Sequence, residues 1–215
     1  KIDLNIELKE SEKFYVEKIN IFGNNITREN VIRNSLLLDE GDGFNKLLLE
    51  KSINKLRSRN FFASVVPNVT TGSTSQFKVL NIEVEEKPTG EISAGAGIGT
   101  SGSQIGFSVT ENNYLGKGIR LETSINFAEE DLRGVIDIRN PNFMYSDRTL
   151  NTRFSSTKTD RVIESGYKNS KTGASVGTSY EQYEDFFFSP NLEIYVEKLK
   201  TDLNASTTLK KQEGN

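Results

Sequence analysis

Residues 79–102, VLNIEVEEKPTGEISAGAGIGTSG, contain two strands of different character that are joined at Pro88. In residues 79–86, apolar and polar side chains alternate, which is the pattern of a half-buried strand in a water-soluble domain. In residues 90–99, isoleucine and alanine alternate with small or polar residues over a length, roughly 9–11 residues, that suits a membrane-spanning strand. Proline has no N–H to donate to a ladder, so Pro88 marks the point where one sheet ends and the next begins.

The composition excludes several classes of protein. The chain has 215 residues, a net charge of −3, no histidine and no cysteine. Serine–histidine–aspartate catalysis, histidine or cysteine metal sites and disulfides are therefore absent from this segment. Because the charge is mixed along the chain, nucleic acid is not expected as a partner. We expect that the chain has no enzymatic activity and binds neither a cofactor nor a metal ion. No window approaches the roughly 18 apolar residues of a transmembrane helix, which excludes helical spans only.

Upstream of the junction, the pattern predicts an α+β domain of order β-α-α-β-β. Strands are expected at 14–22, 61–70 and 76–86. Thr27 is predicted to cap a first helix, and a second helix is predicted over 45–59, with leucine and isoleucine on one stripe. A domain of about 75 residues can form one modest core.

Downstream of the junction, short strands recur with turn residues between them. Besides residues 90–99, strands are predicted at 104–112, 118–128, 132–139, 149–157, 171–181 and 191–197, with the start of another at 202–209. One face of these strands carries charges such as Arg120 and Asp137. Unpaired charges are costly in a closed core, whereas the lumen of a large barrel is wet.

The predicted connections alternate between two kinds, which puts the two kinds at opposite ends of an antiparallel meander. One kind is polar and the other is aromatic. The aromatic kind contains Tyr114, Phe143, Tyr145, Phe186, Phe187 and Phe188. An aromatic rim at one end is typical of a membrane interface. A soluble antiparallel sheet with aromatic turns is the alternative.

One motif is typical of a nucleotide-binding site, but the elements around it do not fit such a site. Residues 97–102, GIGTSG, match the dinucleotide fingerprint G-x-G-x-x-G. That fingerprint requires a helix N-terminus to accept the pyrophosphate, and here a period-2 strand follows. We therefore do not predict a nucleotide site.

The order of several short motifs resembles the BamA family of outer-membrane protein assembly factors. The motifs are FYVEKINIFGN at 14–24, VIR at 31–33, NFF at 60–62, VEEKPTG at 84–90, NNYLGKG at 112–118 and NPNF at 140–143. The resemblance implies the end of one POTRA domain at 1–10, a complete POTRA domain at 11–88, and the N-terminal portion of an antiparallel transmembrane β-barrel at 89–215. Family barrels are larger, so we interpret the chain as part of a longer protein.

The resemblance also implies a function and partners. The protein is expected to fold and insert nascent β-barrel proteins into the bacterial outer membrane, with its POTRA domain in the periplasm and with accessory lipoproteins and the lipid bilayer as further partners. Client strands would add at the barrel seam, on the first barrel strand. The seam residues of that strand are Ile92, Ser93, Ala94, Gly95, Ala96, Gly97, Ile98 and Gly99. Glycine packs nothing across a ladder, which favours a weak seam.

Two further sites are expected in the POTRA domain. An edge strand, at Phe62, Ala63, Ser64, Val65 and Val66, can accept an added strand from a client or partner. Arg33 and Glu40 flank the end of the first helix and are candidate contacts for an accessory lipoprotein; two solvated charges are the alternative. A POTRA–barrel transporter of the two-partner-secretion type, which passes an unfolded substrate through its lumen, remains the second functional interpretation.

Overall fold

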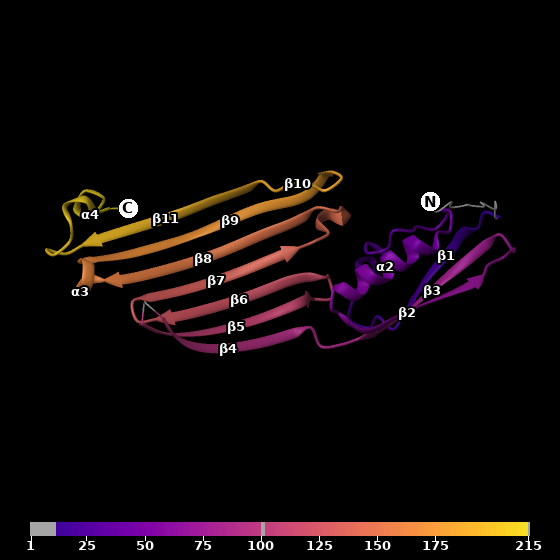
Figure 1. Cartoon of the computed structure of the whole chain (residues 1–215), viewed down its shortest axis with the longest axis horizontal. Helices are drawn as coiled ribbons and strands as arrows, with labels where there is room; N and C mark the ends of the chain where they lie inside the picture. The colour runs from indigo at the N-terminus through magenta and orange to yellow at the C-terminus, as the bar shows by residue number, and fades with distance from the viewer. Residues whose placement is uncertain (1–11, 100–101, 215) are drawn as a thin grey trace, which may run out of the picture. The chain divides into compact units, whose positions relative to one another are not determined.

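The computed structural model describes residues 12–99 and 102–214, and the chain divides into two compact units with the boundary between Lys87 and Pro88 (Figure 1). The expected end of a preceding domain at residues 1–10 lies outside the described residues. Among the residues described, no helix is both long and apolar enough to cross a membrane.

The first unit is a three-stranded mixed sheet with two helices, in the predicted order β-α-α-β-β. Its elements are β1 (Tyr15–Phe22), α1 (Glu29–Arg33), α2 (Lys46–Ser58), β2 (Phe62–Thr71) and β3 (Phe77–Glu86). The strand order is β1-β3-β2, with β3 parallel to β1 and antiparallel to β2. The central position of β3 explains why its alternating residues Leu80, Ile82 and Val84 are all buried.

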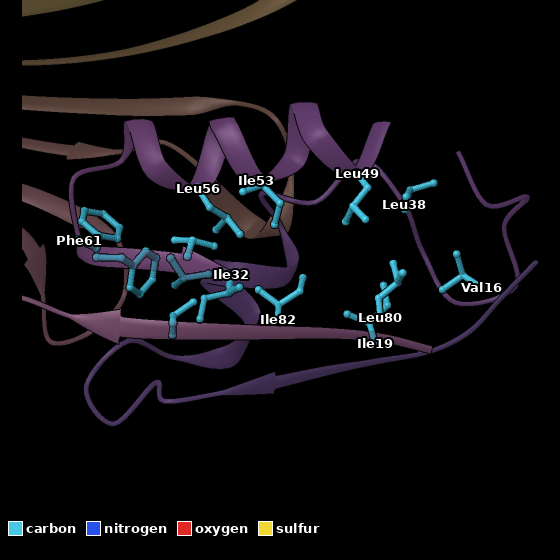
Figure 2. Packing of buried hydrophobic residues seen from close by; sticks show 14 residues of the cluster. Val16, Ile19, Ile32, Leu38, Leu49, Ile53, Leu56, Phe61, Leu80 and Ile82 are labelled. Atoms are coloured by element: carbon cyan, nitrogen blue, oxygen red, sulfur yellow. The ribbon is translucent and has the colours of Figure 1, made fainter. Parts of the chain in front are cut away.

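One hydrophobic core lies between this sheet and its helices. Helix α2 begins where the Asn45 side chain accepts the N–H groups of Leu47 and Leu48, and it buries Leu49, Ile53 and Leu56 at helical spacing. Figure 2 shows these three side chains directed toward residues of the sheet. All 14 buried residues of the cluster belong to the first unit, so this unit has a core of its own.

The start of α1 corrects a prediction. Thr27 is not the N-cap; that position is Arg28, which makes no capping hydrogen bond with its side chain. Thr27 is instead buried, and its N–H donates to Glu86 Oε1 at 2.6 Å. A carboxylate that is distant in sequence thus binds the segment before the helix, which local sequence patterns do not reveal.

The second unit is an eight-stranded antiparallel sheet, open at both sides among the residues described. Its strands are β4 (Gly90–Gly99), β5 (Gly102–Tyr114), β6 (Ile119–Ala128), β7 (Asp131–Asn140), β8 (Thr149–Arg161), β9 (Tyr167–Tyr183), β10 (Phe186–Phe188) and β11 (Asn191–Thr201). Sequential strands pair from β4 to β9, and β9 pairs with both β10 and β11. The short helical segments η1 (Phe143–Tyr145) and α3 (Val162–Ser165) lie in connections between strands, and α4 (Thr207–Lys211) follows β11.

The register gives this sheet two chemically different faces. Residues directly opposite each other in an antiparallel pair share a face. The row Ile92–Val109–Thr123–Ile136–Phe154–Ala174–Ile194 belongs to one face, which we call the apolar face. The row Glu91–Thr110–Glu122–Asp137–Arg153–Ser175–Glu193 belongs to the other, the polar face. Ile92 and Ile98 are 82 % and 90 % exposed, as expected for side chains that face lipid in a barrel wall.

Two predictions in this unit are wrong. Residues 202–209 do not begin a strand, because the chain turns after β11 and Ser206 caps the short helix α4 by accepting the N–H of Leu209. The aromatic stretch 183–188 is not wholly a connection. Its residues Phe186–Phe188 form β10, which pairs with the end of β9 around the tight turn at Glu184 and Asp185.

Candidate functional site

The first candidate site is the free edge of β4. Within the described residues, β4 pairs with β5 alone, in continuous register from Gly90–Glu111 to Gly99–Gly102. Alternate residues of such a strand direct their N–H and C=O groups away from the ladder. The edge therefore offers a row of donors and acceptors that another strand can pair with. All eight predicted seam residues, 92–99, lie in β4.

The glycines of β4 are not required by the sheet that contains them. A Cβ atom at Gly95 would meet nothing within 4 Å, and one at Gly97 would meet only the Gln104 side chain, at 3.6 Å. At Gly106 in β5, by contrast, a Cβ atom would lie 2.5 Å from Asn126 Oδ1. Packing against β5 thus does not account for glycine at positions 95 and 97. Small residues at the edge leave room for whatever approaches from its open side.

Paired charges line the polar face. Arg153 contacts Asp137 with two nitrogens, at 2.7 and 3.1 Å, and Arg120 contacts Glu122 at 2.8 Å. An open hollow of about 530 Å³ lies over these residues, bordered also by Asn151 and Ser175. The pairing explains how charges are accommodated on a sheet face, and it is the chemistry of a water-filled lumen.

The aromatic residues gather at the end of the sheet where β4 begins, which we call the Gly90 end. Tyr114 ends β5, Phe143 and Tyr145 form η1 between β7 and β8, and Phe186, Phe187 and Phe188 form β10. Phe188 packs edge-on against Tyr180 with ring centroids 5.8 Å apart, and Arg148 lies over the Tyr180 ring. The opposite, Gly99 end carries the polar connections. The predicted alternation of connections follows directly from the antiparallel pairing.

The first unit has two edge strands, and one of them is closed. Beside β1, the segment 41–44 adds backbone hydrogen bonds: Val16 N–H donates to the Asp42 carbonyl at 2.8 Å, and Gly41 N–H donates to the Val16 carbonyl at 2.7 Å. Further along, Ile19 N–H donates to Glu40 Oε1 at 3.0 Å, and Arg33 Nη2 donates to the Ile19 carbonyl at 2.8 Å. These contacts occupy the backbone groups with which β1 would otherwise receive an added strand.

This arrangement brings the two predicted lipoprotein contacts together. Arg33 Nη1 lies 3.4 Å from Glu40 Oε1, and Arg33 also pairs with Glu29 at 2.8 Å. The hydrogen bond from Ile19 and the charge of Arg33 lower the pKa of Glu40. Both side chains remain partly exposed, at 37 % for Arg33 and 45 % for Glu40. Their exposed side is available for contact, while their polar atoms already bind the β1 backbone.

The other edge strand, β2, pairs only with β3 among the residues described. Phe62 and Val65 point into the core, whereas Ala63, Ser64 and Val66 are exposed. A hollow of about 600 Å³ runs beside β2, lined by apolar atoms of Phe44, Leu49, Ile53, Pro67 and Val69. Arg57 donates to the Val65 carbonyl at 2.8 Å, so one backbone acceptor of this strand is already engaged. β2 is thus the more open edge of the two.

No cluster of three histidine, cysteine or carboxylate residues within 12–99 and 102–214 is arranged to hold a metal ion.

Comparisons with known proteins agree with this division of the chain. The family model POTRA, surface antigen variable number repeat, matches residues 14–87. The outer membrane protein assembly factor BamA of Buchnera aphidicola is 29 % identical over 158 residues, which are 71 % of this chain and 25 % of the relative. BamA of Neorickettsia risticii is 31 % identical over 129 residues, which are 60 % of this chain and 17 % of the relative.

Solved structures show the same fold. The crystal structure of BamA from Haemophilus ducreyi lacking POTRA domains 1–3 matches with a TM-score of 0.77 at 23 % identity, over 87 % of this chain and 36 % of that one. CdiB from Escherichia coli matches with a TM-score of 0.65 at 13 % identity, over 88 % of this chain and 38 % of that one.

A POTRA domain followed by antiparallel strands of an incomplete barrel defines the class of POTRA–barrel proteins. Within this class, the first unit is a POTRA domain, and the chain is similar in sequence to BamA outer-membrane protein assembly factors over 60–71 % of its length. It spans about a quarter or less of the length of these curated relatives.

Proposed function

We propose that this chain is the part of an outer-membrane protein assembly factor at which client β-barrel proteins are received. The second unit lies in the bacterial outer membrane and the POTRA domain in the periplasm, as in BamA relatives. The observation that carries the proposal is the free edge of β4, which follows the POTRA domain after a short link at Lys87, Pro88 and Thr89. We propose no covalent chemistry, because the pairing of a client strand with β4 supplies the driving force for client binding.

The proposed mechanism is strand addition at β4. The outward-directed N–H and C=O groups of residues 92–99 pair with a strand of the incoming protein, which becomes a temporary neighbour of β4. Gly95 and Gly97 support this interpretation, because glycine contributes no cross-strand contact and lowers strand stability by about 0.5–1 kcal/mol relative to alanine. A weakly held seam partner is easier for a client to displace.

Cysteines placed in β4 of the full-length protein are expected to crosslink to the C-terminal strand of a client during assembly. We would place one cysteine at a time at Ser93, Gly95 and Gly97 and present a client with a single cysteine in its last strand. The expected result is a disulfide-linked product that forms best at one of the three positions, and moving the client cysteine by two residues should shift the best position in β4 by two residues. Cysteine at Ser124, two strands away on the same polar face, is the matched control and should give none.

The alternative is a transporter that passes an unfolded substrate through its lumen. It predicts crosslinks from Ser124 and other polar-face positions, since these would line the path. Equal yields from Ser93 and Ser124, or no product from any position in β4, would count against strand addition. The likeness to CdiB, at 13 % identity, concerns the fold alone and does not favour the transporter.

We further propose that the POTRA domain receives partner strands at β2 and not at β1. Phe62, Ala63, Ser64, Val65 and Val66 remain the candidate docking strand. Support comes from the hydrogen bonds that close β1 at Val16 and Ile19 and from the apolar hollow beside β2. The aromatic residues at the Gly90 end, which is the periplasmic end in this orientation, are proposed to lie at the membrane interface.

Accessory outer-membrane lipoproteins are proposed partners of Arg33 and Glu40. Replacing Glu40 with lysine in the full-length protein is expected to abolish co-purification of the lipoprotein, because it puts a second cation beside Arg33. Glu40→Gln separates this contact from the closure of β1, since glutamine still accepts the Ile19 N–H but lacks the charge. If the charge binds the lipoprotein, both variants lose it, while hydrogen exchange at Ile19 rises only in Glu40→Lys.

Glu29→Gln is the matched control for that experiment, because Glu29 pairs with Arg33 but not with the β1 backbone. It should retain the lipoprotein. Unchanged co-purification of Glu40→Lys would remove Arg33 and Glu40 from the interface and leave them with the closure of β1 as their role.

A further inference from the structure

Four lysines gather on the apolar face at the Gly99 end of β8, β9 and β11. Register places Lys158, Ser170 and Lys198 directly opposite one another in one row. Asp160, Lys168 and Lys200 form the next row toward the Gly99 end. Because paired residues share a face, and residues two apart on a strand do so too, all six side chains emerge on the same side of the sheet. We call these two rows the lysine rows.

The spacing of the lysine rows suits a small, multiply charged group. Neighbouring strands lie about 4.8 Å apart and alternate residues about 6.7 Å apart, so Lys158 and Lys198 are separated by about 10 Å at the backbone. Their long side chains can converge on a single group between them. All four lysines are exposed, which leaves the ammonium groups accessible.

The lysine rows carry excess positive charge. Lys168 pairs with Asp160 at 2.6 Å, and among the ion pairs formed by the described residues the other three lysines of the rows have no carboxylate partner. Glu130, from the adjacent turn between β6 and β7, is paired with Arg161 at 3.0 Å. Within the two rows, four lysines face one aspartate, and Glu213, which accepts a hydrogen bond from Thr201 and lies near Lys200, reduces the net charge from +3 to +2.

The lysine rows continue a surface that faces lipid. On the same face, the next row toward the Gly90 end is Ser156, Thr172 and Val196, and the row after it contains Phe154 and Ile194. Phe154, Ile194 and Val196 are 47 %, 67 % and 67 % exposed. Lysine stems can lie along such apolar surface while the ammonium groups reach the polar layer of a bilayer. The opposite end of this face is different in kind, since Tyr180 packs against Phe188 there and Arg148 stacks on the Tyr180 ring.

We propose that the lysine rows bind the phosphate groups of a phosphorylated lipid in the leaflet at the Gly99 end of the barrel. The proposal rests on the membrane location of the second unit but not on its assembly activity. A phosphorylated lipid satisfies both halves of the surface at once, because its acyl chains cover the apolar rows while its phosphate meets Lys158, Lys198 and Lys200. Such a contact would hold a lipid beside the wall of the barrel at a fixed depth.

The test uses the full-length protein in detergent micelles and lipid A, a glycolipid that carries phosphate, as the probe. We would compare its binding with that of enzymatically dephosphorylated lipid A. The triple variant Lys158→Gln, Lys198→Gln, Lys200→Gln spares the Lys168–Asp160 pair. Each lysine near a charged lipid surface contributes about 1 kcal/mol, so lipid A affinity should fall by at least about tenfold. Binding of the dephosphorylated probe should not change.

A matched control replaces three other exposed lysines, Lys46, Lys51 and Lys117, with glutamine and should bind lipid A as the wild type does. Equal affinity of the wild type for both probes would overturn the proposal, as would an equal loss in the control. Inorganic phosphate that competes as well as lipid A at equal concentration would also overturn it, because the acyl chains would then contribute nothing.

Client assembly by the same variants keeps this proposal separate from the proposed function. Loss of lipid A binding with assembly intact supports the lysine rows as a lipid site. Should the triple variant fail to fold by circular dichroism, the single variants Lys158→Gln and Lys198→Gln are measured instead, each with an expected loss of about fivefold. Unchanged affinity in both single variants would overturn the proposal.

Discussion

Replacing Gly23 with alanine is expected to destabilise the POTRA domain strongly. Gly23 follows β1 with φ of 86°, a conformation that costs a residue with a Cβ atom about 1–2 kcal/mol. The Cβ atom would also lie 1.9 Å from the carbonyl oxygen of Val84, in the central strand β3. Because the clashing atom belongs to the backbone, the clash is relieved only if β1 and β3 move apart. Both strands carry core residues, so this movement disturbs the core.

We expect the free energy of unfolding to fall by about 3 kcal/mol or more, a large fraction of what a domain of this size has. The measurement is urea unfolding of the purified POTRA domain, residues 12–87, monitored by circular dichroism. The domain can be studied in isolation because it has a hydrophobic core of its own. Gly43→Ala is the control. Gly43 has no positive φ and no atom within 4 Å of an added Cβ, so its variant should be neutral. Equal unfolding midpoints for wild type and Gly23→Ala would contradict the structure.

The sequence predicted the strands of this chain well because their patterns are local. Alternation between Gly90 and Gly99 has the bounds of β4, and the proline before it separates the two sheets. Where alternation gave a wrong strand, the competing signal was also local. The strand start predicted at 202–209 is wrong, because Ser206 caps the helix α4 at this place.

The candidate sites also divide into those that follow from local sequence patterns and those that depend on residues distant in the sequence. The exposed edge of β4 follows from its place in the order of strands, so the sequence could predict it. The closure of β1 could not be predicted, because it depends on Arg33 and Glu40 meeting the backbone of Ile19, which is 14 and 21 residues away. The lysine rows were also missed. Lys158, Lys168 and Lys198 look like separate solvated charges until the pairing of three strands puts them on one face.

Replacing Glu86 with glutamine is expected to lower the stability of the POTRA domain by about 2 kcal/mol at pH 7. The carboxylate of Glu86, at the end of β3, accepts the N–H groups of Asn25, Ile26 and Thr27 at 2.8, 2.8 and 2.6 Å. It thereby fixes the segment that joins β1 to α1. Hydrogen bonds to a charged group contribute about 1.5–3 kcal/mol. Glutamine keeps one acceptor oxygen and loses the charge, so three donors are left with one weak acceptor.

The effect should depend on pH in a direction that the hydrogen bonds fix. Partial burial raises the pKa of Glu86, but the hydrogen bonds from Thr27, Ile26 and Asn25 outweigh it and lower the pKa below its ordinary value. A carboxylate with a lowered pKa in the folded state contributes stability that is fully present above its unfolded pKa, about 4.3, and is lost as pH falls through the folded pKa. The stability difference between wild type and Glu86→Gln should therefore be constant from pH 7 to about 5.5 and shrink below pH 4.

Urea unfolding of the POTRA domain at pH 7, 5.5, 4 and 3 measures this difference directly. Glu83→Gln, an exposed glutamate on the same strand, is the matched control and should differ little from the wild type at any of these values. A Glu86→Gln variant as stable as the wild type at pH 7 would show that the loop before α1 does not depend on this carboxylate. A difference that persisted unchanged to pH 3 would assign the loss to side-chain shape, because protonation would then have removed nothing. The stabilities of wild type and Glu86→Gln are expected to converge at low pH. Such convergence means that the charge of Glu86 holds the segment that leads into α1. Glu86 ends β3, four residues before β4 begins.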